Sequence, residues 1–465
     1  MTLARRFAHW SGSLCLEDVP DGVRICARRA ALDTLGVAVA GAVHSKVRLL
    51  GQSIAKIPGN CFAATGQRTD AIAAATINGM AAHLWDYDDN SYTGMIHGSA
   101  IILPAVLAVA QETGASDDDA LLAFIIGSEV AYCLGEICTH SHFMQGWWAT
   151  GSCALIGAVA GISRLYALDA EETANALGMA AVNAGIQRAI AGTDTKPYLC
   201  GNVAAQAITL TRAAQAGLTG PQDAFEQENG FFALLNRAIL LSEHAETLGV
   251  RWRLETPGLL FKTSPVCSAV HAIIEETAKL LEEGGKTADD IETAVAEVPE
   301  LVRASLVFGV PESAQQAQFS LPYCFACAAL HGSVRLQDLS LAELNNRKKQ
   351  DLMQRVTTRN ADDLSTPPES VDFPESVRLT ITFKDGQTIT GFCGEAFGMP
   401  NRPLANHDLQ NKFNDCLAFA GKTQIAPDLN EFSLVGLADQ IFFSLGSNHK
   451  NSTQQGDPNE TAEQT

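Results

Sequence analysis

A short acidic stretch with two histidines is the first place in this sequence where catalysis could occur. Its titratable residues lie close together, in a chain in which only 18% of the residues are charged: His83, Asp86, Asp88, Asp89 and His97. On a helix that begins near Thr69, His83 and Asp86 would be one turn apart on the same face. A polar loop would then present His97 before the apolar run at residue 101. A histidine beside carboxylates transfers protons near neutral pH. We therefore expect an acid–base site here; a solvated helix end with one hydrogen-bonded histidine is the alternative.

Two lysines stand near predicted helix starts. Lys196 is followed by Pro197, which disfavours helical geometry at the lysine, so we expect a helix to begin about five residues later. Lys262 precedes Ser264-Pro265, a pair typical of an N-cap and a first helical position. An ammonium group beside the free N–H groups of a helix N-terminus binds carboxylates or phosphates. The lysines thus predict an anion site at a pocket rim; two unconnected surface charges are the alternative.

Other catalytic chemistries find little support in the sequence. Tyr323 opens a predicted helix and is either a hydroxyl donor or a core aromatic residue. Cys324 and Cys327 form a C-x-x-C pair without a second pair or a nearby histidine, so we do not expect a zinc site. The phosphate-binding, dinucleotide-binding, zinc-protease and serine-hydrolase motifs are missing. Nucleotide binding, zinc hydrolysis and serine hydrolysis are therefore not expected, and no cluster has metal-ligand spacing.

Composition restricts the partners of the protein. The net charge of -20 argues against nucleic acids and anionic membranes, although a small anionic substrate could still bind a locally basic pocket. The twelve cysteines show no framework spacing and are expected to be reduced thiols of a cytoplasmic protein. The N-terminus does not resemble a signal peptide. We expect no apolar run to reach the roughly eighteen residues of a membrane span, and hence a soluble protein.

The hydrophobic pattern predicts a mainly α protein with a smaller α+β part. Residues 1–263 have a helical pattern rich in Ala and Gly, with N-caps at Ser116 and Asp169. Residues 264–398 contain a helix from Ser264, a helix at 321–330 and strands at 291–298 and 377–383. Asp385-Gly386 predicts a hairpin after the second strand. Helices return at 399–445, packing on the first domain, and the polar tail 446–465 is expected to be disordered.

These residues also carry a resemblance to a known family. The matching motifs run in order along almost the whole chain: Asn78-Gly-Met-Ala-Ala-His83, Asp86-Tyr-Asp-Asp89, the His97 loop before Leu103-Pro-Ala, Gly146-Trp-Trp-Ala-Thr-Gly151, Lys196 before Gly201-Asn, Leu218-Thr-Gly-Pro221, Lys262-Thr-Ser-Pro265, Phe319-Ser-Leu-Pro-Tyr323 and Lys412-Phe413. The sequence resembles the MmgE/PrpD family, which includes 2-methylcitrate dehydratase, cis-aconitate decarboxylase and iminodisuccinate epimerase. The resemblance implies a large helical domain built from both chain ends, a smaller lid domain, a homodimer and no cofactor.

The resemblance also implies which residues form the pocket at the domain junction. Catalytic roles would fall to Asp86, His97, Lys196, Lys262 and Tyr323, and substrate contacts to His83, Asn90 and Trp148. In these roles the lysines hold carboxylates, His97 moves a proton, and Asp86 orients or tunes His97. This chain departs from the family twice. Gly98 replaces the usual proline after His97, and Trp148 replaces a histidine.

Three functions follow from this reading. The first is a cofactor-independent lyase for a di- or tricarboxylate, similar to 2-methylcitrate dehydratase or cis-aconitate decarboxylase. The second is an epimerase of a dicarboxylate such as iminodisuccinate, which abstracts and returns one proton. The third is a catalytically silent dimer that binds a carboxylate. Indole is no useful acid, so Trp148 leaves one proton-transfer histidine and argues against efficient dehydration of 2-methylcitrate.

Overall fold

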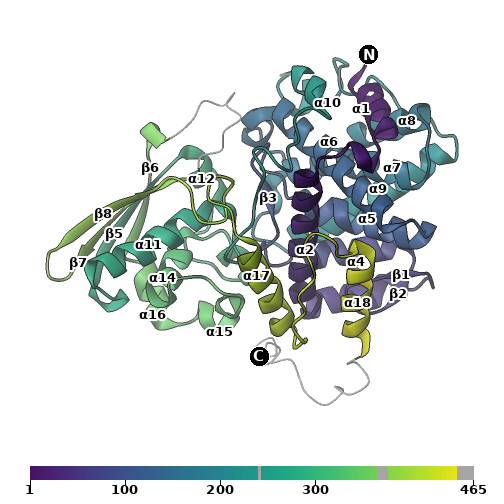
Figure 1. Cartoon of the computed structure of the whole chain (residues 1–465). Coiled ribbons are helices and arrows are strands. Elements are labelled where there is room, and N and C mark those ends of the chain that lie inside the picture. The colour runs from purple at the N-terminus through teal and green to yellow at the C-terminus, as the bar shows by residue number, and fades with distance from the viewer. Residues whose placement is uncertain (239–241, 365–374, 448–465) are drawn as a thin grey trace.

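The protein consists of a large helical part and a smaller part that contains a four-stranded sheet (Figure 1). The computed structural model describes residues 1–238, 242–364 and 375–447. The predicted mainly α fold with an α+β part is therefore confirmed. The predicted tail lies outside the described residues, apart from Gly446 and Ser447, which belong to the last helix. The exact domain boundaries at 263 and 398 stay predictions.

The helical part is drawn from both ends of the chain. Its N-terminal helices are α1 (Leu3–Ser13), α2 (Asp21–Ala42), α3 (Ser45–Ile54), α4 (Ala71–His83), α5 (Ser99–Thr113), α6 (Asp117–Met144), α7 (Ala149–Leu165), α8 (Ala170–Asn183), α9 (Thr195–Gln215) and α10 (Phe231–Leu235). Two C-terminal helices, α17 (Asn406–Phe419) and α18 (Leu434–Ser447), pack against α2 and against α5 and α6. Capping boxes at Ser116 and Asp169 start α6 and α8, as the sequence predicts.

The smaller part is built on a sheet in the order β6-β5-β7-β8. The strands are β5 (Ile291–Val298), β6 (Val356–Asn360), β7 (Val377–Phe383) and β8 (Thr388–Cys393). The helices of this part are α11 (His271–Gly284), α12 (Glu300–Ser305), α13 (Ala314–Ala317), α14 (Leu321–His331), α15 (Leu341–Leu344) and α16 (Arg347–Met353). The predicted hairpin is confirmed: β7 and β8 pair antiparallel around Gly386, whose φ is 86°. Strand β6, which pairs parallel with β5, was not predicted.

Both predicted helix starts beside the lysines are wrong. Lys196 is the second residue of α9, because Pro197 lies in the first helical turn, where a backbone N–H has no intrahelical partner to lose. Ser264 starts no helix: its N–H donates to Nε2 of His271 (3.3 Å), and α11 begins only at His271. The segment before it is extended instead, since β4 (Leu259–Leu260) pairs with β3 (Asn90–Ser91). Lys262 therefore does not precede a helix N-terminus.

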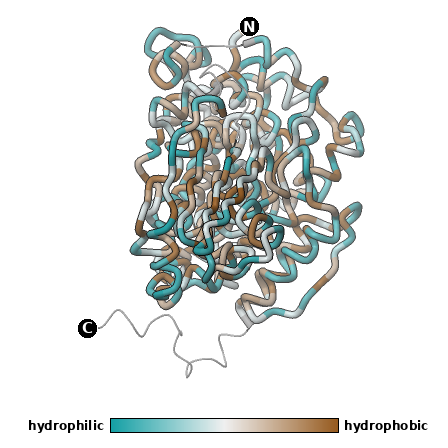
Figure 2. The backbone as a smooth tube through the Cα atoms, turned by 90° about the vertical axis from the view of Figure 1, so that its left-hand side faces the viewer, coloured by the Kyte–Doolittle hydropathy of each residue, from teal (hydrophilic) through white to brown (hydrophobic). Residues whose placement is uncertain are grey.

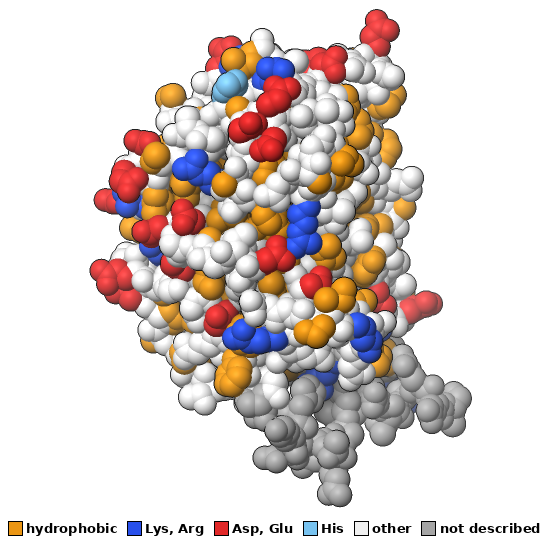
Figure 3. Space-filling model, turned by 90° about the vertical axis from the view of Figure 1, so that its right-hand side faces the viewer, with side chains coloured by type: hydrophobic (Ala, Val, Ile, Leu, Met, Phe, Trp, Pro, Cys, Tyr) orange, Lys and Arg blue, Asp and Glu red, His pale blue; other side chains and the backbone are white. Residues whose placement is uncertain are grey.

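The hydrophobic core continues through the helical part. Hydrophobic segments recur through the middle of the molecule in Figure 2, and the face turned away from the sheet shows hydrophobic side chains between separated charges (Figure 3). Within α6, Asp117–Cys138 is long and apolar enough to cross a membrane, which corrects the expectation that no such run exists. Its apolar window is wholly buried in the protein, as in the core helix of a folded domain.

Small residues allow the helices that carry the site to approach closely. A Cβ on Gly201 of α9 would lie 1.8 Å from the carbonyl oxygen of Thr76 in α4. A Cβ on Gly41 of α2 would lie 2.0 Å from the carbonyl oxygen of Ala81, also in α4. Helix α4 is thus held between α2 and α9 by backbone contacts that no larger side chain permits.

Gly201→Ala is expected to lower the free energy of unfolding by about 1–3 kcal/mol or more, because its methyl group has no space. Gly12→Ala is the matched control, since nothing lies within 4 Å of a Cβ at that helical position. Its stability should be unchanged or raised by up to about 1 kcal/mol. Urea unfolding measures both. Equal effects of the two substitutions would contradict the close approach of α4 and α9.

Candidate active site

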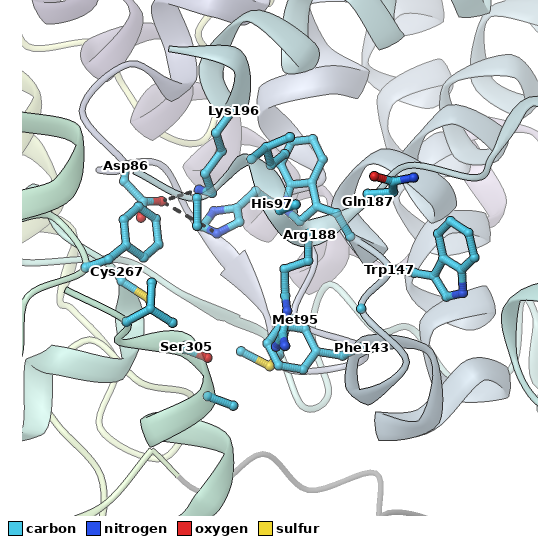
Figure 4. A pocket seen from close by; sticks show the side chains of 18 of the residues that line it. Asp86, Met95, His97, Phe143, Trp147, Gln187, Arg188, Lys196, Cys267 and Ser305 are labelled. Carbon is cyan, nitrogen blue, oxygen red and sulfur yellow. Dashed lines mark hydrogen bonds and ion pairs between the residues drawn. The ribbon is translucent and has the colours of Figure 1, made fainter. Parts of the chain in front are cut away.

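A cavity of about 730 Å³ lies where the two parts meet. Its wall on the helical side comes from the loop after α4, the α6–α7 connection, the segment before α9 and the first turn of α9. The smaller part contributes Cys267, Ser268, Phe319 and the end of α12 with the residues after it. Most of the lining is aromatic or aliphatic, with few charged groups among the described residues: Asp86, Arg188 and Lys196. Figure 4 shows Asp86, Lys196 and His97 together on one side of this cavity.

Asp86 joins the two lysines at the inner end of the cavity. Its Oδ1 accepts hydrogen bonds from Nζ of Lys196 (3.1 Å) and Nζ of Lys262 (2.8 Å). Lys262 also donates to the Asp86 carbonyl oxygen (2.6 Å). This arrangement requires a φ of 47° at Asp86, a left-handed conformation that is uncommon outside glycine. The expected helical stacking of His83 on Asp86 is therefore wrong, because α4 ends at His83.

Asp88 orients both histidines. It accepts from Nδ1 of His83 (2.8 Å) and lies 3.1 Å from Nδ1 of His97, whose Nδ1 also lies 3.1 Å from the Asp89 carbonyl oxygen. Because all these partners are acceptors, the proton of each ring is assigned to Nδ1. The Nε2 atoms are then free to accept. That of His83 accepts from Lys196 (2.6 Å), and that of His97 lies 3.7 Å from Oδ1 of Asp86.

The protonation states follow from burial and from these partners. Burial lowers the pKa of His97 to about 4 and also lowers the pKa of His83, so both rings are neutral near pH 7. Burial alone would raise the pKa of Asp86, but the ammonium groups of Lys196 and Lys262 hold it well below its usual range. Burial would lower the pKa of Lys262, yet the nearby carboxylates raise it. The site thus combines ionised Asp86 and lysines with a neutral His97.

The structure places five of the predicted site residues in the cavity wall. They are Asp86, Asn90, His97, Trp148 and Lys196. The placement of His83 and Lys262 is wrong: both are fully buried behind Asp86 and do not line the cavity. Lys262 is therefore not a rim residue, whereas Lys196 lies in the cavity wall. The orienting role given to Asp86 is corrected as well, because Asp88 contacts the Nδ1 atom that orients His97, whereas Asp86 lies 3.7 Å from Nε2.

The prediction that Tyr323 lies in the pocket is also wrong. It stands in the first turn of α14, capped by Ser320, and is buried away from the cavity. Its hydroxyl donates to the carbonyl oxygen of Asp338 and lies near Nζ of Lys349 (3.5 Å). The residue is thus part of a polar cluster inside the smaller part. Its position after a proline carried no information about which way the ring points.

Three residues for which the sequence predicts no individual role belong to the site. Asp88 stands inside the acidic motif, and its separation of two residues from Asp86 was the available signal. Arg188 lines the cavity but has no local motif. Ser268 also lines the cavity, where its Oγ accepts from Nδ2 of Asn90 (3.2 Å) and donates to buried Glu375 (2.7 Å). Such contacts between distant segments leave no spacing pattern in a sequence.

The departure at Gly98 has a structural reason. A Cβ at this position would lie 2.7 Å from the ring and hydroxyl of Tyr132, a buried residue of α6. Tyr132 thus occupies the space beside the backbone that a proline ring would need. The His97 loop is held by other contacts, including the hydrogen bond from its N–H to Oγ1 of Thr150 (3.0 Å).

One cluster has the residue types of a metal site, which the sequence spacing did not indicate. Ligand atoms of His83, Asp86, Asp88 and His97 lie within 4.8 Å of one another. However, the ammonium groups of Lys196 and Lys262 already bind Oδ1 of Asp86, and Lys196 also binds Nε2 of His83. Two fixed positive charges inside the cluster oppose a cation there. This donor set does not fit a metal ion.

Sequence comparisons agree with this geometry. Residues 5–239 match the MmgE/PrpD N-terminal domain, and residues 264–429 match the MmgE/PrpD C-terminal domain. The chain belongs to the MmgE/PrpD family. The chain is 27% identical to cis-aconitate decarboxylase of Mus musculus over 89% of this chain and 86% of that protein. It is 26% identical to the Homo sapiens cis-aconitate decarboxylase, with 89% and 87% covered. A cis-aconitate decarboxylase-like protein of Aspergillus oryzae is 22% identical over 87% and 88%.

Burial of Lys262 changes the expected effect of removing it. Lys262→Met should lower the free energy of unfolding by about 3–5 kcal/mol, since Asp86 loses a buried partner. Lys46→Met is the control: Lys46 pairs with Asp194 at 2.7 Å, but both side chains are 45% exposed. The free energy of unfolding of the Lys46 variant should fall by no more than about 1 kcal/mol. Urea unfolding at neutral pH measures the free energies of unfolding of the two variants. A Lys262 variant as stable as the Lys46 variant would refute the buried pair.

Proposed function

We propose that this protein is a lyase that removes a carboxylate group as CO2 from a substrate with two or three carboxylates. The supporting observation is the pairing of a cation and a neutral imidazole on one cavity wall. Nζ of Lys196 and Nε2 of His97 lie 3.1 and 3.7 Å from the same Asp86 oxygen. The cis-aconitate decarboxylases among its relatives support the same reaction class.

The proposed reaction needs one proton and no oxidant. The bond between carbon and carboxylate breaks, CO2 leaves, and the electron pair stays on the substrate carbon. The Lys196 ammonium group stabilises this negative charge, a preorganised electrostatic effect. The carbon then takes a proton from the Lys196 ammonium group. Lys196 regains a proton from a solvent water whose other O–H donates to Nε2 of neutral His97, and the hydroxide that remains combines with the released CO2 to leave as bicarbonate. Asp88 keeps His97 in the tautomer whose Nε2 accepts.

Dehydration fits this cavity less well. Loss of hydroxide needs both a base at carbon and an acid at the leaving oxygen. His97 is the one imidazole among the described lining residues, and Trp148 stands where the family resemblance implies a second histidine. The indole ring lies 6.0 Å from the His83 ring and offers no acidic proton. Decarboxylation avoids the requirement for a second acid.

Epimerisation of a dicarboxylate is the second candidate. It is favoured by the same observation, because one proton-transfer histidine is enough to remove and return one proton. A silent carboxylate-binding protein is the third reading from the sequence. The lysine pair on buried Asp86 and the Asp88–His97 contact argue against it. Burying charged groups costs free energy, and a protein that only binds a carboxylate does not need this arrangement.

We also propose a homodimer in the cytoplasm. The surface between α3, α4 and α9 supports the dimer, since it forms a shallow depression with exposed Ile57, Ile72 and Tyr198. Exposed apolar patches of this kind often mark interfaces. The twelve cysteines are all free, which suits a reducing compartment.

Product analysis tests the reaction. Purified protein, treated with EDTA, is incubated in deuterated water with cis-aconitate, citrate, 2-methylcitrate or iminodisuccinate. We expect CO2 release from cis-aconitate, deuterium in the product, and no effect of EDTA. His97→Gln should lose most of this activity. Deuterium exchange into an unchanged dicarboxylate would instead identify an epimerase, and neither turnover nor exchange would identify a silent binder.

Trp148→His tests the reason for preferring decarboxylation. Its imidazole would supply the missing acid, so dehydration of 2-methylcitrate should rise from a low level by about 10²-fold or more. Trp148→Phe is the control, because it keeps an aromatic ring without a titratable group. Liquid chromatography of the dehydrated product measures the rate. Efficient dehydration by the unmodified protein, not improved by histidine, would show that Trp148 does not discriminate between the reactions.

A further inference from the structure

Arg188 is the one arginine among the described residues that line the cavity. It begins a short 3-10 turn, Arg188–Ile190, just before α9. Its backbone N–H donates to the Gly146 carbonyl oxygen (2.7 Å), and Gln187 forms a bridge with Trp147. The guanidinium carbon lies 4.0 Å from the centroid of the Phe143 ring. Figure 4 shows the side chain extending toward Met95 and Phe143, away from Asp86 and Lys196.

The charge of Arg188 is not compensated within the described part of the chain. Its Nη1 is buried without a hydrogen-bond partner, and no described carboxylate forms an ion pair with it. Arg253, which is fully buried, shows the usual arrangement for a buried arginine, because Glu136 accepts from its Nε at 2.8 Å. Partly buried guanidinium groups without a carboxylate are costly. Burial accordingly lowers the pKa of Arg188.

The positive and negative charges at the inner end of the cavity balance one another. Lys196 and Lys262 are balanced by Asp86 and Asp88, since His83 and His97 are neutral. Lys262 is also fully buried and directs two hydrogen bonds to Asp86. It therefore cannot be the second carboxylate clamp that the sequence suggested. The uncompensated positive charge that faces the cavity is that of Arg188.

We propose that Arg188 binds a second carboxylate of the substrate, at the end of the cavity away from the reacting group. This inference rests on the proposed function, which places the reacting carboxylate beside Lys196 and His97. A guanidinium fork matches a carboxylate with two parallel hydrogen bonds, and the Phe143 ring holds its plane. The carbon chain between the two carboxylates lies along the apolar wall of Trp147, Trp148 and Phe308. The site thus selects di- and tricarboxylates over monocarboxylates.

Arg188→Met tests this role by binding as well as by turnover. Tricarballylate, an unreactive tricarboxylate, and crotonate, a monocarboxylate, are titrated by calorimetry. We expect the Kd for tricarballylate to rise about 10- to 100-fold, as for loss of a charge-assisted pair, and that for crotonate to change by less than about 2-fold. The Kd of Arg188→Lys for tricarballylate should lie between those of the unmodified protein and Arg188→Met, since lysine keeps the charge without the guanidinium fork. KM for cis-aconitate should rise by a similar factor, with a smaller change in kcat.

Arg68→Met is the matched control. Arg68 stacks on Phe62 at 4.2 Å in the same manner but lies outside the cavity, so its removal should leave both Kd values unchanged. Circular dichroism checks that each variant is folded. Unchanged tricarballylate binding in Arg188→Met, or a wild-type protein that does not bind tricarballylate, would overturn the role of Arg188. Weakened binding in a protein that releases no CO2 from any substrate would keep this role and refute the proposed lyase instead.

Discussion

The burial of Asp86 between two ammonium groups is the constraint on which the site depends. An ionised carboxylate in the interior is stable only with charged partners, and here Lys196 and Lys262 supply them from segments 110 and 176 residues away. The left-handed conformation of Asp86 is maintained by the same contacts, since Lys262 also binds its carbonyl oxygen. Removing either lysine would therefore disturb the loop as well as the charge balance.

Other residues of the loop after α4 are also held by distant segments. Gln318 donates to the Leu84 carbonyl oxygen (3.2 Å), and Lys412 donates to that of Tyr87 (2.7 Å). Tyr92 donates to Glu375 (2.8 Å). The loop thus receives partners from the smaller part and from the returning C-terminal helix. A complete site requires both parts to be folded, because neither satisfies the polar groups of this loop alone.

The close packing of the helical part has a direct consequence for catalysis. Gly41 and Gly201 let α2 and α9 approach α4 from two sides, and Lys196 is in the first turn of α9. Its ammonium group therefore reaches His83 at the end of α4 without a flexible loop between them. A site placed on packed helices keeps its geometry better than one placed on mobile loops. The neutral state of His97 depends on the same exclusion of water.

The sequence by itself determined the mainly helical fold, the β7–β8 hairpin, the capping boxes and the acidic motif of the candidate site. These features depend on residues within a few positions of one another, such as Ser116 with Asp119 or the Asp385-Gly386 turn. Only the tertiary structure decided that Asp88 orients His97, that Lys262 is buried, and that Tyr323 faces Asp338. It also brought Arg188 to the cavity. The physical reason is that burial and charge pairing depend on neighbours from distant segments, and local spacing carries no record of those neighbours.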